Sequence, residues 1–235
     1  MPNQTNWIDR RRISAALFTG AVGAAGVAVA LIALNPGADH SEASAATVAV
    51  NDAGTKTAPE PSQTFRNGDC DPVEAADSAD LDPWSVSLPA QDLTLNLQAS
   101  GDLTLPAAPE GIFYTGSTPL SGEQGHSVVA GHVDYAPGVL SDQGGELSPW
   151  GQLHKTKPCD VVQAADGEGE VTTFQVTDLY TVPKDELEAS GAFSTTGDHD
   201  LLLVTCSGPS VQDAGAEFQF TYAHNLVVEA VEVEA

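Results

Sequence analysis

Basic side chains are scarce in this chain of 235 residues, which carries 8 lysines and arginines against 33 aspartates and glutamates. The formal net charge of -25 at pH 7 repels phosphate backbones and anionic membrane surfaces. We therefore expect no nucleic-acid partner. The basic residues are also unevenly placed, because Arg10, Arg11 and Arg12 stand together and no arginine follows Arg66.

Cysteine is equally rare, with Cys70, Cys159 and Cys206 as the whole set. No C-x-x-C pair occurs, which disfavours a thiol-redox protein. Three cysteines form at most one intramolecular disulfide and leave one thiol over. If Cys206 is the reactive thiol, Cys70 and Cys159 are the natural pair. Three unrelated free cysteines are the alternative, which suits an oxidising compartment less well.

Sequence patterns for metal binding are missing as well. Acidic residues are many, but they form no loop with the spacing that calcium ligands require. We expect neither a metal nor a cofactor.

One long apolar run is present, from Ile13 to Leu34, directly after the three arginines and without a charged residue. It is long enough to cross a bilayer, and the arginines favour a cytoplasmic N-terminal side. We therefore expect residues 1–12 in the cytoplasm and residues 13–34 as a single-pass membrane anchor. A signal peptide cleaved near Ala43-Ser44-Ala45 and a twin-arginine export signal are the alternatives. Each of these places the remaining chain outside the cytoplasm.

Residues 35–89 are rich in Ala, Asp, Glu, Ser, Thr and Pro and show no sustained periodicity. This composition is typical of a flexible acidic linker, although its last part, around Cys70 and Trp84, is a candidate for order against the next domain. From residue 90 to residue 235 the pattern changes to many short apolar or alternating segments separated by Gly and Pro. They predict one all-β domain, either a closed barrel or a sandwich.

The expected strands are short and either alternate or form a continuous apolar run. They are Leu93–Leu97, Leu103–Leu105, Ile112–Tyr114, Ser127–Ala130, Val161–Val162, Val171–Val182, Leu201–Thr205, Phe218–Tyr222 and Leu226–Val233. Two short helices are expected between them, over Pro149–His154 and Lys184–Ala189.

One of these strands, Leu201–Thr205, ends in Cys206, and Ser-Gly-Pro follows as turn chemistry. A strand end holds a thiol rigidly and leaves it reachable, which suits a nucleophile. A small apolar cysteine that fills a core is the alternative for a lone thiol.

Another apolar strand ends at Gly131, with His132 directly after it and Asp134 two residues further on. Histidine titrates near neutral pH and is the most frequent general acid or base. A histidine at a strand end is more often structural, so His132 becomes a candidate only together with Cys206.

The two stretches Val-Val-Ala-Gly-His-Val-Asp and Leu-Leu-Val-Thr-Cys together resemble the sortase family of cysteine transpeptidases, most closely the class F sortases of actinobacteria and then class E. The resemblance covers residues 91–231 and implies an eight-stranded sortase-type β-barrel with short helices, with residues 90–235 as the catalytic domain. It includes Leu103-Thr104-Leu105-Pro106, Gly111-Ile112-Phe113-Tyr114, Trp150–Leu153, Lys157-Pro158-Cys159-Asp160-Val161 and Asn225-Leu226-Val227-Val228.

The resemblance implies that Cys206 cleaves an LPXTG-like sorting signal through a thioester and that His132 acts as general acid and base. Thr205 and Ser207 would frame the nucleophile and contact the substrate, and Asp134 would orient His132. The implied partners are surface proteins or pilins that carry the signal, and an amine acceptor from peptidoglycan or a pilin lysine. The enzyme would work outside the cytoplasm, attached to the cell membrane.

The chain departs from the family at one position. Sortases carry an arginine on the strand after the cysteine loop, and the matching segment here is Tyr222-Ala223-His224-Asn225. Three explanations stay open: His224 replaces the arginine as oxyanion donor, a lysine reaches in from a loop, or the protein is an impaired sortase-like binding module. The lysines in question are Lys155, Lys157 and Lys184. We favour His224 and an active enzyme, because an inert relative has less reason to keep both the thiol and the imidazole.

Overall fold

The computed structural model describes residues 49–50, 56–68, 70–71, 80–142, 144–213 and 220–233. The chain divides into two units, Met1–Glu42 and Ala43–Ala235, and every described residue belongs to the second. The expected cytoplasmic segment 1–12 and the expected membrane segment 13–34 lie outside the described residues. Within the described part of the chain, no helix combines the length and the apolar character that a membrane crossing needs.

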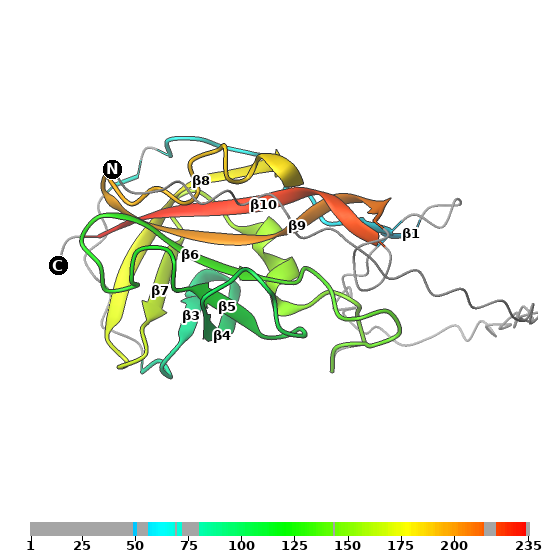
Figure 1. Cartoon of the computed structure of the whole chain (residues 1–235), viewed down its shortest axis with the longest axis horizontal. Helices are drawn as coiled ribbons and strands as arrows, with labels where there is room; N and C mark the ends of the chain where they lie inside the picture. Colours follow the sequence, from blue (N-terminus) through cyan, green and yellow to red (C-terminus); the bar gives the residue numbers. More distant parts are fainter. Residues whose placement is uncertain are drawn as a thin grey trace, which may run out of the picture. The chain divides into compact units, whose positions relative to one another are not determined.

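Eight strands close into a barrel in the order β3-β4-β5-β6-β9-β10-β8-β7, and β7 pairs with β3 to complete the ring (Figure 1). The pairs β4–β5 and β6–β9 are parallel, and the others are antiparallel. The eight strands are β3 (Ser85–Leu88), β4 (Leu93–Ser100), β5 (Gly111–Tyr114), β6 (Gly125–Gly131), β7 (Val161–Ala165), β8 (Val171–Pro183), β9 (His199–Gln212) and β10 (Phe220–Glu232). The expected all-β fold with an eight-stranded barrel is confirmed.

Short elements connect and precede these strands. They are β1 (Ala49–Val50), β2 (Lys56–Ala58) and the 3-10 helices η1 (Pro89–Gln91), η2 (Pro149–Lys155) and η3 (Lys184–Glu186). The two expected helices are thus present as η2 and η3. Both are tight 3-10 turns, and η3 is shorter than the Lys184–Ala189 helix that the sequence predicts.

Apolar side chains fill the barrel interior. Trp150 of η2 and Phe174 of β8 are fully buried there, together with leucines and valines from the surrounding strands. An eight-stranded barrel has an interior just wide enough for such side chains to fill, so the structure is a packed core and not a channel. Burial of this apolar surface is the main favourable term in folding.

Strand β9 is buried on both faces, which explains its continuous apolar sequence. Leu201 and Leu203 pack in the barrel core, whereas Leu202 and Val204 pack in a second cluster on the other face. This second cluster also contains Val128, Tyr180, Ala192 and Val227. Alternation is lost wherever both faces of a strand are covered. The same parity places Cys206 on the face of Leu202 and Val204.

Three expected strand assignments differ from the structure. The strand expected to end at Thr205 continues as β9 to Gln212, so Cys206 and the Ser-Gly-Pro segment lie inside it, where they pair with β10 and β2. The segments Phe218–Tyr222 and Leu226–Val233 are joined, because β10 runs without a break from Phe220 to Glu232. Residues 101–110 form a loop in place of the strand expected at Leu103–Leu105, and Leu103 is 51% exposed. The alternating Leu103 and Leu105 therefore lie in a loop and do not form the buried face of a sheet.

Within residues 35–89, the range expected as a flexible linker, the described part is attached to the barrel, and this attachment includes Cys70 and Trp84, where order was expected. Strand β3 lies within that range and is a wall of the barrel, and β2 pairs with β9 at Gly208 and Pro209. Between them, Phe65 bridges Leu179, and Cys70 forms a disulfide with Cys159 with 5.5 Å between the Cα atoms. Backbone pairing and a covalent bond hold this segment, and neither requires a periodic apolar pattern.

A cation–π contact adds to the attachment of the same segment. The guanidinium carbon of Arg66 lies 3.2 Å from the ring centroid of Tyr180, and its Nη1 lies 3.7 Å from Asp178 Oδ1. Arg66 is thereby committed to the side of the barrel formed by β8 and is not available to a distant site.

Candidate active site

The free thiol of the described residues belongs to Cys206, on the second half of β9. Its Cα partner on β10 is Asn225. Burial raises the pKa of the Cys206 thiol to about 11, while the charge of Lys184 lowers it and that of Asp134 raises it. The side chain is nevertheless partly exposed. The resting group is therefore a neutral thiol that a reactant can reach.

His132 stands beside this thiol because of the parallel pairing of β6 and β9. Ala130 of β6 is the Cα partner of Val204 of β9. His132 and Cys206 each lie two residues beyond this pair, so the register puts them at the same level. His132 directly follows the last residue of β6, whereas Cys206 lies inside β9, which continues to Gln212. His132 and Cys206 are 74 residues apart in the sequence, and the parallel β6–β9 register brings them to the same level.

Close packing around Gly131 fixes the backbone of His132. A Cβ added at Gly131 would lie 2.2 Å from Cε2 of Trp150, so the indole ring packs directly against this glycine. The hydroxyl of Ser148, the N-cap of η2, donates a hydrogen bond to the carbonyl of His132. The glycine before His132 is thus required for packing, and η2 anchors the histidine through its main chain.

Cys206 and His132 line one cavity of about 850 Å³. Its wall comes from the 103–108 loop, the end of β6 with the 132–139 loop, η3 with Leu187, the middle of β9 and the first half of β10. The apolar members include Leu103, Leu105, Val133, Val139, Leu187 and Val204. Leu103 and Val139 are 51% and 48% exposed, so two of the few exposed large apolar side chains lie at this cavity.

Asp134, the expected partner of His132, lines the same cavity and is held by Tyr222. The Tyr222 hydroxyl donates to Asp134 Oδ2 over 2.7 Å. Burial raises the pKa of Asp134, whereas the Tyr222 hydrogen bond and the charges of Lys56 and His132 lower it. The carboxylate is thus close enough to His132 to interact with it electrostatically, while its hydrogen bond goes to the tyrosine.

The two residues expected to frame the nucleophile behave differently. Thr205 lines the cavity, and its hydroxyl donates to the Gly131 carbonyl over 2.8 Å, which ties β9 to the residue before His132. Ser207 is fully buried, its Oγ has no hydrogen-bond partner, and it does not line the cavity. Thr205 therefore stabilises the site geometry, and Ser207 is out of reach of a substrate.

His224, expected to replace the missing arginine, does not line the cavity. Successive side chains of a strand point to opposite faces, and Asn225 occupies the face of Cys206. His224 instead lies beside Gly208 and 3.4 Å from Glu60 Oε1. Gly208 has φ of +76° and a Cβ there would lie 2.6 Å from His224 Nδ1, so this contact needs glycine.

Asn225 is the site residue that the sequence reasoning did not single out. A bulge between Tyr222 and His224 shifts the β9–β10 register, and no local sequence signal marks it. The carboxamide is largely buried, and its Nδ2 donates to the Lys184 carbonyl over 3.4 Å. Of the three lysines considered, Lys184 lines the cavity, whereas Lys155 and Lys157 do not.

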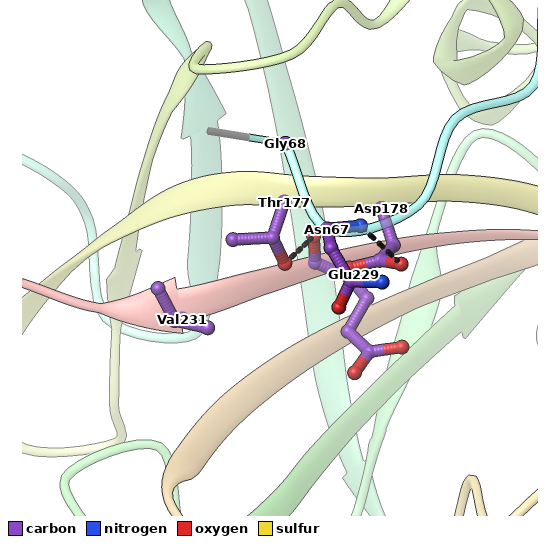
Figure 2. A pocket seen from close by; sticks show the side chains of 6 residues that line it. All are labelled: Asn67, Gly68, Thr177, Asp178, Glu229 and Val231. Carbon is purple, nitrogen blue, oxygen red and sulfur yellow. Dashed lines mark hydrogen bonds between the residues drawn. The ribbon is translucent and has the colours of Figure 1, made fainter. Parts of the chain in front are cut away.

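A second, smaller hollow of about 440 Å³ lies where the 65–68 segment crosses β8 and β10. Figure 2 shows its polar lining, in which the backbone N–H of Asn67 donates to Asp178 Oδ1 and the hydroxyl of Thr177 donates to the Glu229 carbonyl. Asp178 is also paired with Arg66. The lining has no thiol, hydroxyl–histidine pair or other nucleophile, so this hollow offers no catalytic group.

Three strands bring together the one group of potential metal ligands found within the described ranges. His126 of β6, Asp200 of β9 and Glu229 of β10 have ligand atoms within 4.8 Å of one another. Burial, followed by the charge of Glu229, raises the pKa of Asp200 to about 6. The group is assembled by cross-strand register, which is why the search for a ligand loop in the sequence missed it.

The structures similar to this chain include sortase A from Corynebacterium diphtheriae, with 22% identity, a TM-score of 0.47 and coverage of 64% of this chain and 60% of that one. Sortase C-1 from Actinomyces oris gives 21% identity and a TM-score of 0.48, with coverage of 66% of this chain and 77% of that one. Sortase C1 from Streptococcus agalactiae gives 23% identity and a TM-score of 0.46, with coverage of 64% of this chain and 67% of that one.

These likenesses are too distant to transfer an activity, and this chain spans less than two thirds of the length of the Corynebacterium diphtheriae enzyme. No protein with a curated description matches the chain. The model of the sortase domain family, in contrast, matches residues 86–233, which include every strand of the barrel and every residue of the cavity. Because this match covers more than half of the chain, the protein belongs to the sortase family.

Proposed function

We propose that the protein is an extracytoplasmic cysteine transpeptidase that cleaves an LPXTG-like sorting signal and transfers it to an amine. The observation that carries this proposal is the arrangement of Cys206 and His132 at the same level of two adjacent parallel strands, lining one cavity. A thiol and an imidazole so placed are the nucleophile and the general acid–base that thioester chemistry needs.

The cavity walls support a peptide with apolar side chains. Leu103, Leu105, Val139 and Leu187 line it, and the volume of about 850 Å³ is in the range of sites that bury several side chains. The leucine and proline of a sorting signal would bury apolar surface against these walls, which contributes roughly 25 cal/mol per Å². The Thr carbonyl of the signal would then face Cys206.

In the first half-reaction the Cys206 thiol is neutral at the start, because its pKa is about 11. Its proton passes to His132 as the sulfur attacks the Thr carbonyl carbon, and the carbonyl π pair moves onto oxygen to give a tetrahedral oxyanion. Collapse of that intermediate breaks the Thr–Gly C–N bond. The imidazolium of His132 returns the proton to the leaving glycine amine, and a thioester to Cys206 remains.

In the second half-reaction an amine attacks the thioester carbonyl. His132 accepts a proton from the attacking nitrogen, a new amide C–N bond forms, and the C–S bond breaks as the sulfur regains a proton. The proposed acceptors are a peptidoglycan amine or a pilin lysine, and water gives hydrolysis when no amine is present. The product is a surface protein or pilin joined covalently to its acceptor.

The location we propose is the outer side of the cell membrane, with residues 13–34 as a single-pass anchor. The Cys70–Cys159 disulfide supports an oxidising compartment. The motifs around His132 and Cys206 favour the class F sortases of actinobacteria as the nearest group, followed by class E.

A binding module is the second candidate, and one observation favours it. No arginine lines the cavity, and the thiol is held in its unreactive neutral form. Such a protein would hold a sorting signal in the same groove without breaking the Thr–Gly bond.

The test uses the full-length chain with a fluorescence-quenched LPXTG peptide and hydroxylamine as the amine. We expect a hydroxamate that ends at the Thr residue, no product from Cys206→Ala, and a loss of about 100-fold or more from His132→Ala. The matched control is His224→Ala, which removes an imidazole from the opposite face of β10 and should keep wild-type turnover. Peptide binding without hydroxamate across a panel of motifs would favour the binding module, and absence of both would contradict the proposal.

A further inference from the structure

The proposed reaction places a full negative charge on the carbonyl oxygen in the tetrahedral intermediate. Hydrogen-bond donors aimed at that oxygen commonly make the largest single contribution to such catalysis. The donors must lie beside the attacking sulfur, so they come from residues that share the face of Cys206 and line its cavity. Two polar side chains of β10 and η3 meet these conditions.

Asn225 is the first. It is the direct cross-strand partner of Cys206, it lies on the same face, and it lines the cavity. Directly opposed residues of an antiparallel pair have Cβ atoms about 4.5–5.5 Å apart, which is the range in which a carboxamide reaches a group bonded to the sulfur. The carboxamide has two N–H donors, and its hydrogen bond to the Lys184 carbonyl uses one.

Lys184 is the second. It is the first residue of η3 and directly follows β8, two residues beyond Val182, which is the Cα partner of Asn225. Its Nζ donates to Thr221 Oγ1 over 2.5 Å, and Thr221 also lines the cavity. The ammonium carries three N–H donors, so this bond leaves two for a ligand.

The other basic side chains that the structure describes are engaged elsewhere or point away. Lys56 pairs with Glu146 over 3.7 Å, and Arg66 pairs with Asp178 and lies over Tyr180. Lys155 and Lys157 are exposed and do not line the cavity. Within the described ranges, Lys184 is the cation of this cavity.

We propose that the Asn225 carboxamide and the Lys184 ammonium together stabilise the oxyanion of the tetrahedral intermediate at Cys206. The two side chains would supply the hydrogen bonds and the positive charge that a single arginine supplies in other sortases. This inference rests on the proposed transpeptidase function. Asn225 supplies the directed neutral hydrogen bond, and Lys184 supplies the charge. The shared hydrogen bond between them fixes Asn225 relative to the backbone that carries Lys184.

The test compares Lys184→Gln, Lys184→Arg and Asn225→Ala in the full-length chain with the same peptide and hydroxylamine. The matched control is Lys157→Gln, which removes the same charge from an exposed lysine outside the cavity. We expect kcat to fall roughly 100-fold in Asn225→Ala and about 10- to 100-fold in Lys184→Gln, with KM changed less than about threefold. Lys184→Arg and Lys157→Gln should stay within about threefold of wild type.

A second measurement separates failure of this inference from failure of the proposed function. The rate of Cys206 alkylation by iodoacetamide, followed against pH, reports the thiolate and needs no turnover. Lys184→Gln should slow alkylation about threefold or more at a fixed pH, because loss of the ammonium raises the thiol pKa, and Lys157→Gln should not.

The outcomes are distinct. Wild-type turnover with Lys184→Gln and Asn225→Ala unaffected would overturn the inference and leave the enzyme. No wild-type turnover would sink the proposed function and with it the oxyanion role. Equal alkylation rates in wild type and Lys184→Gln would show that the ammonium does not act at Cys206 at all.

Discussion

The hydrogen bond from Tyr222 to Asp134 should stabilise the protein in a pH-dependent way. Burial raises the pKa of Asp134 above its ordinary value, so the charged form is penalised, and the Tyr222 hydroxyl offsets part of that penalty. Tyr222 stays protonated across the useful range, because burial and the nearby carboxylate raise its own pKa. Tyr222→Phe keeps the buried ring and removes only the donor. A hydrogen bond to a charged group is worth about 1.5–3 kcal/mol when buried, and the partial exposure of Asp134 brings the expected loss to about 1–2 kcal/mol.

The sign follows from which form of Asp134 uses the bond. The bond stabilises the carboxylate, so the loss in Tyr222→Phe is complete at neutral pH and disappears as the pH falls below the pKa of Asp134. Urea unfolding of both proteins at pH 7.5 and near pH 3.5 measures this difference. In an Asp134→Asn background the same substitution should matter less. A loss in Tyr222→Phe that is equal at both pH values would refute the reasoning.

Two further predictions concern the frame of the barrel. Replacing Cys70 and Cys159 by serine removes a cross-link between residues 89 positions apart in the sequence. We expect the free energy of unfolding, measured in urea, to fall by about 2–4.5 kcal/mol. A loss below about 1 kcal/mol would show that the pairing of β2 with β9 and of Phe65 with Leu179 holds the segment without the disulfide. Burial raises the folded-state pKa of Asp200 to about 6, so its charge destabilises the fold increasingly as the pH rises from about 4 to 6. Asp200→Asn should therefore raise the melting temperature at pH 7.5 and leave it unchanged near pH 4. A lower melting temperature of the variant at pH 7.5 would contradict this prediction.

Much of the fold was predictable from sequence because strands depend on local patterns, and the two side chains proposed to react, which the family resemblance singled out, line one cavity. Apolar runs bounded by Gly and Pro predict the strands, and His132 and Cys206 each follow such a run directly. Strand β9 illustrates why this works, since an uninterrupted apolar stretch requires cover on both faces, and the structure supplies it. The short 3-10 helices also follow local rules, with Pro149 at the start of η2 and Ser148 as its N-cap.

The partners of the reacting side chains were not predictable, because they depend on register. The bulge between Tyr222 and His224 decides that Asn225, and not His224, faces Cys206, and a shift of one residue exchanges the two faces of a strand. The attachment of residues 56–71 shows no periodic apolar pattern, because main-chain pairing and the stacking of Arg66 on Tyr180 add to the Cys70–Cys159 disulfide that the cysteine count had indicated. Long-range pairing therefore determines the parts of this attachment that the sequence did not predict.

A free thiol outside the cytoplasm faces oxidants, and the thiolate is the form that they attack. Burial and the charge of Asp134 hold Cys206 in the neutral form, with a pKa of about 11, and so protect it at rest. In the proposed reaction this shift makes a spontaneous thiolate rare, so the nucleophile has to be generated while substrate is bound. His132 would generate it, because proton transfer to the imidazole can accompany attack. In the proposed oxyanion role, Lys184 would stabilise the charge that appears on the substrate oxygen. In the proposed mechanism the thiolate, the imidazolium and the oxyanion form only during the reaction. The electrostatic stabilisation therefore acts on the transition state, where it accelerates a reaction.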